Sequence, residues 1–228
     1  MRNFKIILQY EGTRYQGWQR QESTQNTIQG KLERLLTRLA GTEVEIQASG
    51  RTDAGVHAYG QVANFHMDTE LSAQELMEKI NEYLPEDIGV IAIEEVPERF
   101  HSRLNAKGKT YRYRVLNSAV PHIFDRRYVY VCPEKLDVEE MRRAAALLCG
   151  THDYRAFTSA KRSRKSTVRS VDSIDIERMG DEIWFTFSGN GFLFHMVRIL
   201  MGTLLEVGSG KRKAGEMTAL LENGKRED

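Results

Sequence analysis

The 228-residue chain has little cysteine, little proline and no large excess of charge. Its two cysteines, Cys132 and Cys149, are too few for a disulfide framework, so we expect free thiols and a cytoplasmic protein. No run approaches the roughly 18 apolar residues of a membrane-spanning helix. The N-terminus lacks the cleavage site of a signal peptide. These absences argue against a secreted disulfide scaffold and against a membrane protein.

The formal net charge is only +1, whereas many nucleic-acid binders are strongly basic. The charge is nevertheless uneven along the chain. Residues 160–170, "AKRSRKSTVRS", contain no acid, and residues 107–115, "KGKTYRYRV", interleave cations with tyrosines. Such runs are typical of solvated loops as well as of polyanion-binding surfaces, so composition leaves both interpretations open.

Local patterns in the first half predict alternating strands and helices. Residues 4–10 alternate as a half-buried strand does, and residues 28–39 carry a leucine face between an N-cap at Thr27 and a stop at Gly41. Strands are expected at 44–49 and 61–67. The glycine-rich stretch between them, "ASGRTDAGVHA", is therefore predicted to be a loop between two strands.

A capping-box pattern at Ser72 and Glu75 predicts the next helix, which Pro85 ends. Its inward face is expected to hold Leu76, Ile80, Tyr83 and Leu84. Further strands are expected at 88–96 and 110–117.

The second half repeats this mixture of helices and strands. We expect a helix over 136–150, a pair of antiparallel strands at 167–179 and 182–190, an apolar helix within 191–210 and a short helix at 214–221. The pattern predicts two α+β units that join near residues 103–108.

Asp53 and His57 are the first candidates for chemistry. Asp53 is either an aspartate that caps a turn or a reactive carboxylate that nearby Arg51 keeps ionised. The six histidines show no metal-ligand spacing, so we expect no metal site and interpret His57 as a structural hydrogen-bonding residue. The chain also lacks a phosphate loop and a nucleophile elbow.

Tyr111 and Arg198 are the other two candidates. Tyr111, beside Lys109 and Arg112, is either a sheet tyrosine or a platform for a nucleobase. Arg198 lies in an otherwise apolar helix, where it must reach solvent or pair with an anion.

Four motifs resemble those of the tRNA pseudouridine synthase A family, in family order and across nearly the whole chain. They are "YEGTRYQGWQRQ" followed by "TIQGKLERLL", then "GRTDAGVHA", then "FHSRLNAKGKTYRYRV", then "GNGFLFHMVRILMGTLLEVGSG". The resemblance implies the pseudouridine synthase fold, in which two similar α/β units, here 1–104 and 105–228, share a mostly antiparallel mixed sheet with helices packed on it.

The resemblance also implies an isomerase that acts on uridines 38, 39 and 40 of tRNA without metal, cofactor or energy source. Asp53 would be the catalytic residue and Arg198 its ion-pair partner, while Tyr111 would stack on the uracil. Arg51 would open the RNA helix and hold the place of the flipped base, and Lys109 would contact substrate. Whether the aspartate attacks C1′ or removes a C2′ proton stays open.

The family works as a homodimer whose basic clefts hold tRNA. The resemblance therefore makes cations of the N-terminal motif and of the basic run candidates for RNA contact: Arg14, Lys161, Arg162, Arg164 and Lys165. A non-catalytic RNA-binding or tRNA-folding protein is an alternative, but pure binding does not need the carboxylate. A paralogue that acts on other uridines is a second alternative.

The chain departs from the family pattern at its end. Family members continue with a Pro/Ala-rich turn and a final strand, whereas this sequence stops at "ENGKRED". Either the sequence is truncated or the C-terminal sheet lacks one strand, and the missing strand would leave an exposed sheet edge.

Overall fold

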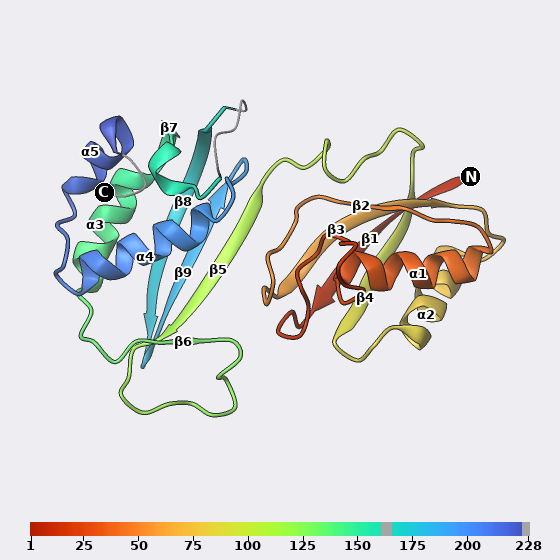
Figure 1. The fold of residues 1–228 in the computed structure, drawn as a ribbon, viewed down its shortest axis with the longest axis horizontal. Coiled ribbons are helices and arrows are strands. Elements are labelled where there is room, and N and C mark those ends of the chain that lie inside the picture. Colours follow the sequence, from red (N-terminus) through yellow and green to blue (C-terminus); the bar gives the residue numbers. More distant parts are fainter. Residues whose placement is uncertain (161–165, 225–228) are drawn as a thin grey trace. The chain divides into compact units, whose positions relative to one another are not determined.

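The computed structural model describes residues 1–160 and 166–224 (Figure 1). The chain divides into two compact units, Met1–Ala106 and Lys107–Asp228, each with its own sheet and its own hydrophobic core. The predicted α+β class is confirmed. The basic residues Lys161, Arg162, Arg164 and Lys165 lie outside the described residues.

The strands form two sheets, one in each unit. Within the described residues, every strand pairs with strands of its own unit. Short connections favour this arrangement because strands that are near in sequence tend to become neighbours in space.

The first unit is a four-stranded antiparallel sheet in the order β2-β3-β1-β4 with two helices. Alternate residues Phe4, Ile6 and Leu8 of the central strand are fully buried and share one core with both helices. The elements in chain order are β1 (Arg2–Tyr10), α1 (Ile28–Ala40), β2 (Ile46–Ala48), β3 (Ala58–Met67), α2 (Ala73–Tyr83) and β4 (Ile88–Val96).

Both ends of α1 confirm the sequence prediction. The Thr27 hydroxyl oxygen accepts a hydrogen bond from the Gly30 amide at 3.2 Å. Gly41 ends the helix with φ 72°, and its amide donates to the Thr37 carbonyl at 2.9 Å. A side chain at Gly41 would oppose this left-handed conformation, which is why glycine ends the helix.

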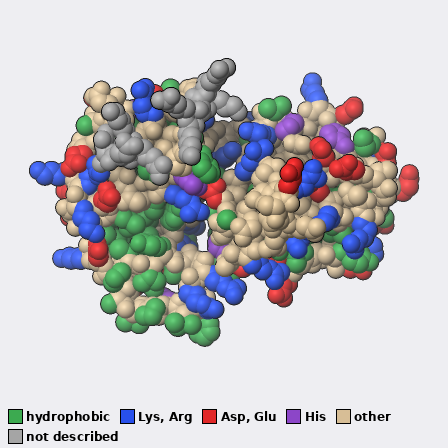
Figure 2. Space-filling model, in the orientation of Figure 1, with side chains coloured by type: hydrophobic (Ala, Val, Ile, Leu, Met, Phe, Trp, Pro, Cys, Tyr) green, Lys and Arg blue, Asp and Glu red, His purple; other side chains and the backbone are tan. Residues whose placement is uncertain are grey.

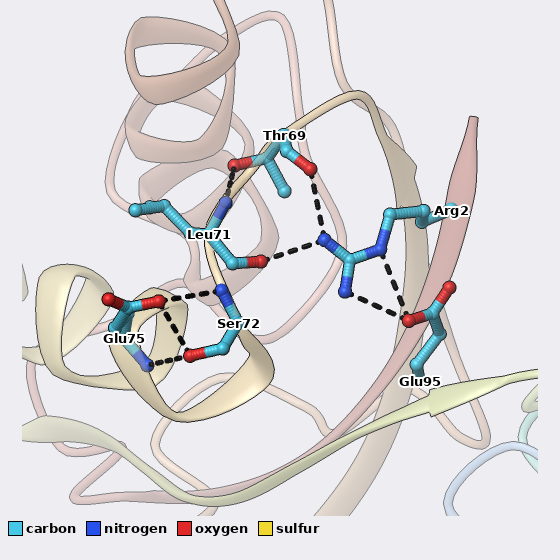
Figure 3. Close-up of polar contacts among 6 residues, drawn as sticks. All are labelled: Arg2, Thr69, Leu71, Ser72, Glu75 and Glu95. Atoms are coloured by element: carbon cyan, nitrogen blue, oxygen red, sulfur yellow. Dashed lines mark hydrogen bonds and ion pairs between the residues drawn. The ribbon is translucent and has the colours of Figure 1, made fainter.

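The predicted capping box at the start of α2 is also present (Figure 3). The Ser72 hydroxyl oxygen accepts from the Glu75 amide at 3.3 Å, and the Glu75 carboxylate accepts from the Ser72 amide at 2.8 Å. Just before the helix, the Arg2 guanidinium donates to the Thr69 carbonyl at 2.9 Å and also binds Glu95. These contacts join the segment that leads into α2 to strands β1 and β4.

The expectation that Tyr83 points inward was wrong. Only Leu76 and Ile80 of α2 are buried, whereas Tyr83 is exposed, with Lys79 over its ring at 5.1 Å. Tyr83 follows Leu76 by seven residues and so lies in nearly the same direction around the helix. It is the last residue of α2, beyond the part of that face that the core covers.

The second unit is a five-stranded sheet in the order β6-β5-β9-β8-β7, in which only β5 and β6 run parallel. Helices α3 and α4 contribute buried residues to the same core as β8 and β9. The elements are β5 (Lys109–Leu116), β6 (Tyr130–Val131), α3 (Val138–Leu148), β7 (Gly150–Asp153), the 3₁₀ helix η1 (Arg155–Phe157), β8 (Val168–Met179), β9 (Glu182–Gly189), α4 (Met196–Gly208) and α5 (Glu216–Asn223).

Two features of this unit differ from the sequence analysis. The short strands β6 and β7 were not anticipated, and Gly150 begins β7, whereas it was expected to close α3. Helix α4 begins only at Met196, because residues 192–195 adopt a non-helical conformation.

The loop between β5 and β6 exposes several large apolar side chains (Figure 2). The exposed fractions of Val120, Ile123 and Phe124 are 68%, 60% and 95%. Exposed apolar side chains that gather in one place are uncommon on monomeric proteins and typically mark a binding surface.

Candidate active site

Asp53 lies in the loop of residues 49–57 that joins β2 to β3, which confirms the predicted placement between two strands. We call this segment the Asp53 loop. Its first end is tied to the sheet because the Ser49 amide donates to the Val62 carbonyl at 2.8 Å. Asp53 itself is half-buried, and Arg51 is exposed.

Residues 10–18 hold the Asp53 loop on both sides of the aspartate, and we call them the bracing segment. The Trp18 amide donates to the Thr52 carbonyl at 3.0 Å, and the Gly55 amide donates to the Tyr15 carbonyl at 3.2 Å. The Tyr10 hydroxyl lies 2.9 Å from the Thr52 hydroxyl. Asp53 is therefore flanked by hydrogen-bonded residues, although its segment is neither helix nor strand.

Two glycines, Gly12 and Gly17, allow the bracing segment to contact the backbone of the Asp53 loop. A Cβ atom on Gly12 would lie 2.0 Å from the Val56 carbonyl oxygen, and one on Gly17 would lie 2.8 Å from the Thr52 carbonyl oxygen. Gly17 also has φ 89°, a conformation that other residues rarely adopt. The glycines of the N-terminal motif are thus required by contact with the Asp53 loop.

The bracing segment is itself anchored at Asp87. The Tyr15 hydroxyl donates to Asp87 Oδ1 at 2.5 Å, and Arg14 Nε lies 2.5 Å from Asp87 Oδ2. Tyr15 is almost completely buried, and this burial raises the pKa of its hydroxyl to about 12. The phenol therefore stays protonated and keeps donating to Asp87 at neutral pH.

Arg14, a predicted RNA contact, is thus engaged in an ion pair within its own unit. Its guanidinium also lies over the Tyr15 ring, with Cζ 5.8 Å from the ring centroid. More than half of the Arg14 side chain remains exposed. The structure assigns Arg14 a bracing contact, and a role toward RNA stays a prediction.

His57 confirms its interpretation as a structural residue. Its Nδ1 atom accepts a hydrogen bond from the Gly12 amide at 3.1 Å and lies 3.4 Å from Glu11 Oε1. Because Nδ1 accepts the amide hydrogen, it does not donate to Glu11 in the same tautomer. His57 thereby adds another link between the Asp53 loop and the bracing segment.

Tyr111 lies on β5 in the second unit, on the sheet face that packs against the core. Its ring is nearly perpendicular to that of Phe192, with ring centroids 5.4 Å apart. Arg112 lies on the other face, over Trp184 at 4.7 Å. Lys109 begins the same strand and pairs in register with Gly189.

Arg198 lies in the first turn of α4 and is exposed. This exposure is compatible with both alternatives for an arginine in an apolar helix, so pairing with an anion stays a prediction. The helix buries its opposite side through Met196, Leu200 and Leu204, all of which are fully buried. This packing holds the helix on which the exposed Arg198 lies.

The structure thus brings together Arg51 and Asp53 in the first unit, and Lys109 and Tyr111 on one strand of the second. Sequence reasoning missed the bracing contacts of Tyr15, Gly17 and Asp87. The only signal for them was the N-terminal motif, which identified the segment without showing what it contacts.

Comparison with known proteins identifies the family. The family model for tRNA pseudouridine synthase matches residues 6–105 and 144–228. The chain therefore belongs to the tRNA pseudouridine synthase family. Asp53 and Arg198 lie within the matched residues, whereas Lys109 and Tyr111 lie between them.

Curated relatives agree over nearly the full length. The chain is 45% identical over 223 residues to tRNA pseudouridine synthase A of Bacillus sp. (strain KSM-64), which covers 98% of this chain and 91% of that protein. It is 43% identical over 226 residues to tRNA pseudouridine synthase A of Acetivibrio thermocellus, covering 99% and 92%. It is 44% identical over 228 residues to tRNA pseudouridine synthase A 1 of Clostridium tetani, covering 100% and 93%.

In residues 1–160 and 166–224, no helix has the length and apolar character needed to cross a bilayer. Over the same part of the chain, no three His, Cys, Asp or Glu side chains lie close enough together to hold a metal ion.

Replacement of Gly12 tests the close approach of the bracing segment to the Asp53 loop. We expect Gly12→Ala to lower the free energy of unfolding by about 1–3 kcal/mol, because the new Cβ overlaps the Val56 carbonyl. Amides of the Asp53 loop should also exchange faster with deuterium. Gly89→Ala in β4 is the matched control, since no heavy atom lies within 4 Å of its Cβ position. Equal stability and exchange in the two variants would contradict the bracing contact.

The buried phenol predicts a dependence of stability on alkaline pH. The folded pKa of Tyr15 is about 12 and the unfolded value is about 10, so folding favours the protonated form. The contribution of the Tyr15 hydroxyl to folding stability is complete below about pH 10 and is lost as the pH rises through about 12. In urea unfolding at neutral pH, the free energy of unfolding of the wild type should exceed that of Tyr15→Phe by about 1–3 kcal/mol. This difference should become smaller above about pH 10. If the difference in free energy of unfolding stays constant up to about pH 12, the protonated phenol of Tyr15 does not stabilise the fold.

Proposed function

We propose that this protein converts uridine to pseudouridine at positions 38, 39 and 40 in the anticodon stem-loop of tRNA. Family membership supports the reaction, and relatives that are 43–45% identical to this chain carry the name tRNA pseudouridine synthase A. The observation that carries the proposal is the half-buried Asp53 carboxylate on a loop held rigid from both sides.

The reaction is an isomerisation, so the atoms of substrate and product are the same. The C1′–N1 glycosidic bond breaks, the base turns, and C1′ bonds to C5. N1 gains a proton and C5 loses one, so no oxidant, reductant or group donor enters the balance. We propose that Asp53 acts at the sugar, either by attack on C1′ or by removal of the C2′ proton.

The remaining roles follow the chemistry of each side chain. Tyr111 would stack on the uracil and assist loss of the C5 proton, while Lys109 would contact the substrate beside it. Arg198 would pair with the Asp53 carboxylate and keep it ionised when the bound RNA excludes water. The accessible guanidinium of Arg198 and the half-buried side chain of Asp53 support these assignments.

Arg51 would act on the RNA. A uridine in a stem must leave the stack before its sugar becomes accessible, at a cost of a few kcal/mol. The exposed Arg51, two residues before Asp53, is suited to occupy the vacated position. Phosphate contacts would come from Arg14 and from the run with Lys161, Arg162, Arg164 and Lys165, whose local charge matters more than the net charge of the chain.

We further propose that the protein is a cytoplasmic homodimer. The apolar loop between β5 and β6, with Phe124 95% exposed, supports association because such a surface is stabilised when it is covered. A cytoplasmic location agrees with a tRNA substrate and with free cysteines.

Replacement of Asp53 is the direct test. We expect Asp53→Asn to reduce pseudouridine formation by about 10³-fold or more, because the amide can neither attack the sugar nor accept its proton. Binding of the tRNA should change little. The measurement is tritium release from C5 of labelled uridine in tRNA with uridine at positions 38 to 40, followed by mapping of the products.

Asp181→Asn is the control, because Asp181 is an exposed aspartate in the turn between β8 and β9. Its tritium release should equal that of wild type. If the folded wild-type protein binds tRNA and releases no tritium, the proposal fails and a non-catalytic RNA-binding role takes its place. Products at other positions would indicate a paralogue with a different target.

A further inference from the structure

Phe194 and His195 form an aromatic pair directly before α4. Their rings are stacked, with centroids 3.8 Å apart and planes inclined by 27°. The exposed fraction of Phe194 is 55%, so His195 covers part of the ring while much of it remains accessible. An accessible ring backed by a second ring is a surface on which a further planar group can stack.

The backbone of this pair is held in an unusual conformation. His195 has φ 60° and ψ 7°, and it is the one non-glycine residue with positive φ among residues 1–160 and 166–224. Such a conformation costs free energy and persists only where the surroundings enforce it. Residues of this kind concentrate at sites of function, so the pair calls for an explanation beyond packing.

Three hydrogen bonds fix the pair to the segment after η1. The Phe194 carbonyl accepts from the Thr158 hydroxyl at 3.0 Å and from the Ser159 amide at 3.3 Å. His195 Nδ1 lies 2.6 Å from the Ser159 hydroxyl oxygen. Both rings therefore stand on a support with little freedom, which lowers the entropy lost when a ligand stacks on them.

The pair lies in sequence between a residue that contacts Tyr111 and the proposed substrate residue Arg198. Phe192, two positions earlier, contacts Tyr111. Arg198 follows in the first turn of α4 and is exposed. Accessible aromatic rings with a cation nearby are how proteins hold unpaired nucleobases.

We propose that Phe194, backed by His195, stacks on an unpaired nucleobase of the anticodon loop that neighbours the target uridine. The inference rests on the proposed function, because that function supplies an RNA loop with unpaired bases. Tyr111 would take the target base itself, and the aromatic pair would hold an adjacent one. Stacking of this kind tolerates different bases, since every base presents a flat face.

The test measures binding of an anticodon-arm RNA to the full-length protein with position 194 replaced. Phe194→Leu keeps an apolar side chain and should weaken binding by about 5- to 150-fold, the range for loss of one base–aromatic stack. Phe194→Trp should bind as wild type does. Tyr83→Ala, at an exposed aromatic residue of α2 with 52% exposure, should leave binding unchanged. Thermal unfolding of each variant checks that it is folded.

A second series locates the base. Each unpaired nucleotide of the RNA is replaced in turn by an abasic one, and wild type is compared with Phe194→Leu. For one abasic position in the RNA, wild type and Phe194→Leu should bind with equal affinity, because the base on which Phe194 stacks is missing. A difference that stays the same for every abasic RNA, or a Phe194→Leu variant that binds as wild type does, would overturn the proposal.

Tritium release by the wild type separates this inference from the proposed function. If the wild type forms pseudouridine while Phe194→Leu binds normally, only the stacking proposal fails. If the wild type binds the RNA and forms no pseudouridine, the proposed function fails, and the abasic series still decides whether Phe194 stacks on RNA.

Discussion

The close approach of residues 10–18 to the Asp53 loop is the constraint on which the candidate site of the first unit depends. Gly12 and Gly17 leave no room for a Cβ atom against the Val56 and Thr52 carbonyl oxygens. Their absence of a side chain lets hydrogen bonds form on both sides of Asp53. Burial of Tyr15 and Trp18 stabilises the bracing segment by about 2–3 kcal/mol per side chain, which offsets the entropy lost in ordering it.

The candidate residues of the second unit also lie on elements that pack against a hydrophobic core. Tyr111 stands on a strand that packs against the core, and Arg198 stands on a helix whose opposite side is buried. Chemistry that depends on position benefits from such supports, because a misplacement of about 1 Å can cost a hundredfold in rate. The left-handed His195 fits this pattern, since three hydrogen bonds hold it and Phe194.

Sequence reasoning predicted the parts of the fold that local patterns determine. The alternation in β1, the Thr27 cap and the Ser72–Glu75 capping box all depend on neighbours within a few residues. Strands β6 and β7 escaped detection because two and four residues are too few to show a period. Asp53 was identified as a candidate, but its support depends on Tyr15 and Asp87, which lie far from it in sequence. No local pattern indicates that Arg14 pairs with Asp87.

The single-turnover rate of a Gly17→Ala variant tests the central claim most directly. With the protein in excess over an anticodon-arm RNA, the rate reports the chemical step at the Asp53 loop. A Cβ at Gly17 would press on the Thr52 carbonyl next to Asp53, so we predict a rate about 10- to 100-fold lower with unchanged RNA affinity. A variant that is as fast as wild type would show that the bracing segment does not position the aspartate.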